Sequence, residues 1–206
     1  DFSIQETLER LKALVDPPEL LDANVTRVQV SSCSPPQLLA LCNTVPFLAS
    51  RRMVILEGLL ALFEGRRASR RGRGAQDSSS PWLSIVEQIP NMPSSTDLVL
   101  VNGAIRRDNV LLSRLSPLGQ VKEFRALSSA GLNRWIQERA AERSCTISRE
   151  GVQLLAELVG GNLWIMSSEI EKLSLYCQGR TVKAEDIQLL VSFTKEINIF
   201  NVVDTM

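Results

Sequence analysis

Apolar residues near the start of the chain recur with the period of a helix. Three of them share one helical face: Ile4, Leu8 and Leu11. They follow the sequence Ser-Ile-Gln-Glu at 3–6, a capping box in which a hydroxyl and a carboxylate satisfy free amides, so the helix is predicted to begin there. A second capping box at 34–37, with proline at its first helical position, predicts another helix that runs through Cys42.

Short runs of apolar or β-branched residues elsewhere in the first part of the chain predict strands. Residues 25–30 are rich in valine and threonine, which favour strands. The runs 53–56 and 98–101 are wholly apolar, which is typical of strands buried on both faces, and 121–124 is a fourth candidate. A helix is predicted at 81–89. Strands that alternate with helices indicate a parallel α/β sheet.

From Ser128 onward only the helical period remains. Apolar residues mark the faces of four helices, of which the second is capped by Ser148 and ends at Gly160, and the third ends near Gly179. The predicted fold is therefore α/β and then all-α. We expect an α/β domain over 1–125 and a helical domain over 126–195.

Composition excludes several classes of partner, catalytic site and metal site. The 206 residues hold 23 Lys and Arg against 23 Asp and Glu, so no global basic field indicates nucleic acid or an anionic membrane as the main partner. The absence of histidine excludes Ser-His-Asp and Cys-His catalysis and any His-containing metal site. Four cysteines lie apart without a C-x-x-C pair, which favours buried thiols in a reduced cytoplasm: Cys33, Cys42, Cys145 and Cys177. We expect neither a metal nor a cofactor.

The pattern breaks down once, over residues 64–80. This stretch has no large apolar residue and carries five arginines: Arg66, Arg67, Arg70, Arg71 and Arg73. We expect a mobile surface loop. Its arginines are candidates for contact with DNA phosphates, but a solvated insertion that contacts nothing is favoured.

Deleting residues 66–79 should leave the fold nearly intact. The closure entropy of a flexible loop changes by only about 0.6 kcal/mol per doubling of its length. A thermal melt of the deletion variant measures the effect. A melting temperature lowered by more than about 8 °C would show that the segment is packed.

Motifs for phosphate chemistry are missing. No G-x-x-x-x-G-K-[ST] occurs, and no G-x-G-x-x-G follows a predicted strand. The run 53–56 is followed by a single carboxylate, Glu57, and not by the acidic pair that would hold magnesium and water. Glu57 is interpreted as a strand-end carboxylate.

Several segments, in order, resemble the delta subunit of bacterial DNA polymerase III, the clamp-loader subunit. The hallmark segment is Val-Pro-Phe-Leu-Ala-Ser-Arg-Arg-Met-Val-Ile-Leu-Glu-Gly at 45–58. Further similar segments follow in the family's order: 97–103, 132–136, 160–164, 169–175 and 198–204. The resemblance covers nearly the whole chain except the arginine-rich stretch.

This resemblance implies a degenerate AAA+-like domain without working ATPase residues, a helical lid, and a collar domain that starts at 196–206 and is otherwise absent. It also implies that the first strand of the sheet precedes Asp1. Lid segments of active AAA+ proteins carry a nucleotide-sensing arginine, whereas Asn162, Leu163 and Trp164 stand here. Members of the family bind the ring-shaped sliding clamp and hold it open for placement on primed DNA.

Phe47 and Leu48 are the predicted clamp-binding residues. They follow Pro46, which ends a helix, and precede a strand, so they lie on a connector where a large apolar pair is hard to bury. One of them could still fill the core beneath the sheet. The resemblance favours exposure, because the family inserts an apolar pair at this position into a pocket on the clamp.

The resulting prediction is a clamp-loader subunit that binds and opens the sliding clamp (the beta subunit) and works with ATPase partner subunits on primed DNA. It would have no catalytic site of its own, within a DNA-directed DNA polymerase (nucleotidyltransferase) holoenzyme in the cytoplasm, away from membranes. Two alternatives remain. One is an active AAA+ ATPase whose P-loop lies upstream, and the other is a DNA-binding adaptor that acts through the arginine-rich loop.

Overall fold

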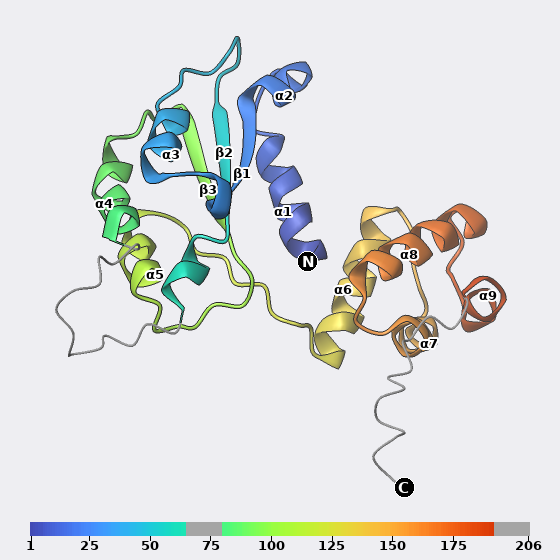
Figure 1. Ribbon diagram of the computed structural model, residues 1–206. Helices are drawn as coiled ribbons and strands as arrows, with labels where there is room; N and C mark the ends of the chain where they lie inside the picture. The colour runs from blue at the N-terminus through green and yellow to red at the C-terminus, as the bar shows by residue number, and fades with distance from the viewer. Residues whose placement is uncertain (65–79, 192–206) are drawn as a thin grey trace, which may run out of the picture. The chain divides into compact units, whose positions relative to one another are not determined.

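The computed structural model describes residues 1–64 and 80–191 (Figure 1). The chain divides into two compact units, of which the first holds Asp1 and Ser3–Glu123 and the second begins at Phe124 and also takes in Phe2. Within the described ranges, no helix has both the length and the apolar character needed to cross a membrane. The predicted arginine-rich loop and the predicted start of a collar domain lie outside the described residues.

The first unit is built on a parallel sheet of three strands in the order β1-β2-β3, as far as the described residues show. β1 is Val25–Gln29, β2 is Arg52–Glu57 and β3 is Thr96–Val101. β2 pairs with both neighbours and is buried along nearly its whole length. The predicted parallel α/β sheet is confirmed.

Helices cover both faces of this sheet (Figure 1). Alternate side chains of β2 point to opposite faces, as strand geometry requires. Met53 and Ile55 pack in the cluster that contains Leu8 of α1 (Phe2–Lys12). Val54 and Leu56 pack in the cluster on the other face, which three helices build: α3 (Pro35–Cys42), α4 (Ser80–Gln88) and α5 (Val110–Leu115).

Two strand predictions differ from the structure. β3 was predicted to be buried on both faces, yet its residues are only partly buried, because it is an edge of the described sheet. The predicted strand at 121–124 is wrong, since no regular structure forms there and Val121 is exposed. Lys122 and Glu123 stand in the middle of that run, which weakens it as a strand.

Helix starts follow side-chain caps. The first helix begins earlier than predicted, because the carboxylate of Asp1 accepts from the Ser3 amide at 3.0 Å and caps it. The second capping box is confirmed, since Gln37 Oε1 accepts from the backbone N–H of Ser34 at 2.8 Å. Shorter helical turns complete this unit: α2 (Leu21–Asn24), η1 (Pro18–Leu20), η2 (Val30–Ser32), η3 (Leu60–Phe63), η4 (Ile89–Asn91) and η5 (Ser116–Leu118).

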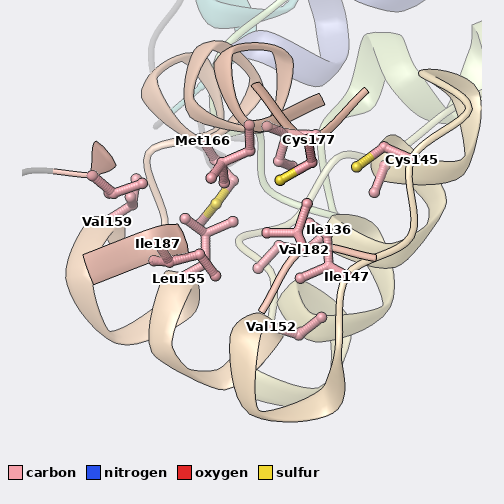
Figure 2. Packing of buried hydrophobic residues seen from close by; sticks show 14 of the residues in the cluster. Ile136, Cys145, Ile147, Val152, Leu155, Val159, Met166, Cys177, Val182 and Ile187 are labelled. Carbon is pink, nitrogen blue, oxygen red and sulfur yellow. The ribbon is translucent and has the colours of Figure 1, made fainter. Parts of the chain in front are cut away.

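The second unit contains the four predicted helices. They are α6 (Ser129–Glu142), α7 (Arg149–Val159), α8 (Leu163–Cys177) and α9 (Ala184–Leu190). Their inward faces form one core, in which Figure 2 shows Leu155, Met166 and Ile187 gathered between the helices. Ser148 caps α7, as predicted, by accepting from the Gly151 amide at 3.1 Å.

All four cysteines are buried free thiols, which confirms their interpretation from the sequence. Burial raises the pKa of each thiol, because the interior disfavours the thiolate. For Cys42 the pKa rises to about 11. These thiols therefore stay protonated near neutral pH and serve as small apolar side chains.

Candidate protein-binding loop

Residues 43–51 connect α3 to β2, and they carry large apolar side chains in solvent. The exposed fraction is 80% for Val45, 58% for Phe47 and 76% for Leu48. In Figure 1 this loop extends beyond the sheet at the end where β2 begins. Exposed apolar residues scattered singly are ordinary, whereas three on one short loop make it a candidate interaction site.

The two ends of the loop are held to the beginning of β3. Where α3 ends, the Thr96 hydroxyl donates to the carbonyl oxygen of Cys42 at 2.8 Å. Where β2 begins, Arg51 Nη1 donates to the two carboxylate oxygens of Asp97 at 2.7 and 2.8 Å. The loop is therefore a short span between two fixed points.

Asn24 holds the middle of the loop. It is the last residue of α2 and is completely buried. Its Nδ2 donates to the carbonyl oxygens of Phe47 at 2.9 Å and Leu20 at 3.0 Å. Its Oδ1 accepts from the backbone N–H of Phe47 at 2.7 Å. Both main-chain groups of Phe47 are thus paired, while its side chain stays outside.

The chain turns sharply at the next residue. Leu48 has φ of +49°, in the left-handed region that a leucine rarely adopts. Directly after it, Ala49 packs against the apolar cluster that contains Val15, and the Ser50 amide donates to the Asp16 carbonyl at 3.2 Å. Such a conformation persists only where its surroundings hold it, so the contacts on both sides keep Leu48 turned outward.

The exposure of Phe47 and Leu48 removes the alternative that either fills the core. Their role in binding stays a prediction. Sequence reasoning missed Val45, although it stands in the same apolar run just before Pro46. It also missed Asn24, for which no local signal exists, because its partner is 23 residues away.

The other candidate residues differ in outcome. The five arginines at 66, 67, 70, 71 and 73 lie outside the described residues. Glu57 is a strand-end carboxylate, as interpreted, and it accepts from Arg27 and Gln29 of the neighbouring strand. Within the described ranges, no group of three Cys, Asp or Glu residues is placed to hold a metal ion.

Known proteins resemble this chain along most of its length. It is 25% identical over 98% of its residues to DNA polymerase III subunit delta of Bacillus subtilis strain 168, and it spans 57% of that protein. A solved structure of the Bacillus subtilis DNA clamp loader delta protein matches with a TM-score of 0.73 and 22% identity, covering 94% of this chain and 56% of that one. A family described as a "middle domain" matches residues 130–189.

The comparisons confirm the predicted resemblance to the delta subunit. They also confirm the predicted order of the fold, an α/β part with a parallel sheet followed by helices, since the solved structure of the delta protein matches it. Because this chain spans little more than half of both proteins, the activity and partners of a whole delta subunit are not carried over with the likeness.

Proposed function

We propose that this chain acts in a DNA polymerase III clamp loader as the delta subunit, where it binds the sliding clamp and favours its open state. The observation that carries this proposal is the loop at 43–51, which presents Phe47 and Leu48 in solvent on a main chain held by Asn24. The likeness to Bacillus subtilis DNA polymerase III subunit delta supports the choice of partner.

The proposed mechanism is mechanical. An aromatic and an aliphatic side chain that enter one pocket can supply several kcal/mol of binding free energy. A ligand shifts a conformational equilibrium by as much as its affinities for the two states differ. Docking of Phe47 and Leu48 would therefore favour the clamp with one interface open, provided that the open form binds them better.

The remaining partners follow from the same proposal. Other clamp-loader subunits would handle ATP, and the complex as a whole would meet primed DNA in the cytoplasm, without a membrane. This chain would contribute no catalytic residue to the polymerase holoenzyme, whose nucleotidyl transfer belongs to other subunits.

Co-elution with the sliding clamp of the same organism tests the proposal. We expect the purified protein and the clamp to elute together in gel filtration, both with and without ATP. Separate elution under both conditions, at concentrations well above micromolar, would contradict it.

The chain is expected not to hydrolyse ATP on its own. The sequence has no phosphate-binding glycine motif, and Glu57, the carboxylate at the end of β2, already accepts from Arg27 and Gln29. Phosphoryl transfer needs groups that stabilise its developing charge. Release of inorganic phosphate measures the activity, and magnesium-dependent multiple turnover by the purified full-length protein would favour the active-ATPase alternative, whose P-loop lies upstream.

The DNA-adaptor alternative makes a separate forecast. Binding through the arginine-rich segment would give a duplex affinity that falls steeply with salt, because each neutralised phosphate releases a counterion. That affinity would survive alanine at both Phe47 and Leu48. Under the proposed function, by contrast, affinity for the clamp would depend little on salt and would be lost with alanine at both Phe47 and Leu48.

A further inference from the structure

Two buried asparagines hold loops at opposite ends of β2. Asn24 holds the main chain of Phe47, just before the strand begins. Asn109 caps α5 by accepting from the amides of Leu111 and Leu112, and its Nδ2 donates to the carbonyl oxygen of Leu60, just after the strand ends. Both side chains are buried and both bond to main-chain groups, and Asn109 Nδ2 also donates to the carboxylate of Glu64 at 3.0 Å.

We propose that Asn24 is a positioning residue for the clamp-binding loop, and this inference rests on the proposed function. Its side-chain amide fixes the backbone of Phe47 before a partner arrives. Phe47 and Leu48 are then presented in the geometry that binds. These hydrogen bonds of Asn24 go to the backbone of Phe47 and not to either apolar side chain.

The large apolar side chains of the loop do little to hold it, so hydrogen bonds from Asn24 are needed. Val45, Phe47 and Leu48 are mostly exposed, whereas Ala49, which follows them, packs against the core. Leu48 is held in a left-handed conformation that a free leucine rarely adopts. Without the paired main chain of Phe47, the loop would sample other conformations, in which the two side chains no longer point outward together.

Affinity depends on the fraction of molecules that already have the binding geometry. The observed dissociation constant equals the intrinsic one divided by that fraction. Ordering a loop at the moment of binding therefore weakens the complex without removing any contact. Asn24 would act in this way, through Phe47 and Leu48, and would not itself touch the clamp.

Replacing Asn24 by alanine tests its positioning role. Asn24→Ala leaves the amide and carbonyl of Phe47 unpaired, so we expect the dissociation constant for the sliding clamp to rise about tenfold, with the competent fraction reduced to about one tenth. Asn109→Ala is the matched control. It removes buried hydrogen bonds at the other end of β2, and we expect the same constant to stay within about twofold at a temperature where both variants are folded.

Two further readouts separate positioning from general stability. In the wild-type protein the Phe47 amide should exchange slowly with deuterium, and Asn24→Ala but not Asn109→Ala should accelerate it. In a protein that already carries Phe47→Ala and Leu48→Ala, Asn24→Ala should cost no further clamp affinity, since the side chains it positions are gone.

The inference is overturned by normal clamp affinity in Asn24→Ala, by equal weakening in Asn109→Ala, or by fast exchange of the Phe47 amide in the wild-type protein. This last measurement needs no variant that folds. Failure of the proposed function would look different. In that case Phe47→Ala with Leu48→Ala would bind the clamp normally, whatever the exchange at Phe47 shows.

Discussion

Alanine at both Phe47 and Leu48 is expected to weaken binding to the sliding clamp by at least about 30-fold. Apolar anchors in a pocket typically cost about 2 to 4 kcal/mol each on truncation, and about 1.4 kcal/mol corresponds to tenfold. Losses at adjacent sites need not add, so the lower bound takes one anchor alone. Titration of the double variant against the clamp measures the dissociation constant.

The same variant should keep its stability. Phe47 and Leu48 are exposed, so their truncation should change the free energy of unfolding by less than about 1 kcal/mol. Leu175→Ala is a matched control, since this leucine is 71% exposed on α8 of the second unit and should affect neither quantity. A double variant that unfolds easily yet binds the clamp normally would contradict a binding role for this exposed pair.

Truncation in the middle of the sheet should have the opposite effect. Ile55→Ala is expected to lower the free energy of unfolding by about 2 to 5 kcal/mol, because the removed atoms lose their burial and leave a cavity. Ile55 is completely buried in β2, where it packs in the same cluster as Leu8 and Met53. Denaturant unfolding followed by circular dichroism measures the change.

Ile55→Val is the graded comparison for this prediction. It removes one methylene from the same site and should cost about 0.5 to 1.5 kcal/mol. If Ile55→Ala lowers the free energy of unfolding by less than about 1 kcal/mol, this would contradict the placement of β2 at the centre of the first unit's core. Together, the loop and strand variants separate binding from folding within one unit.

Local patterns predicted most of the fold. The run at 53–56 is wholly apolar, so it could be predicted as a strand buried on both faces. The structure explains this pattern, because β2 has helices on both faces and a neighbouring strand at each edge. Each helix of the second unit carries its apolar residues at helical spacing, and Ser148 announces the start of α7. In these elements the local signal and the tertiary packing agree.

Predictions failed where an element depends on something distant. A strand needs a partner strand, and the sequence Val-Lys-Glu-Phe at 121–124 does not reveal whether one is available. The partial burial of β3 follows from its place in the sheet order, which is not readable in its own six residues. The start of α1 shifted because Asp1 provides a carboxylate cap ahead of the capping box.

The candidate site divides in the same way. Phe47 and Leu48 follow Pro46 between the end of α3 at Cys42 and the start of β2, so their exposure on a connector could be predicted from the sequence. The hydrogen bonds from Asn24 to the backbone of Phe47 could not be predicted, because an asparagine at the end of a short helix is also an ordinary turn residue. Only the fold brings Asn24 against Phe47, across two separate segments of chain.

Photocrosslinking tests the contact between this loop and the sliding clamp most directly. A photoreactive phenylalanine analogue would replace Phe47 in one sample and Leu175, which is also exposed, in another. After illumination with the clamp alone, we expect a crosslinked product from position 47, mapped to one site on the clamp, and none from position 175. Equal crosslinking at both positions, or none at position 47, would contradict the docking of the loop onto the clamp.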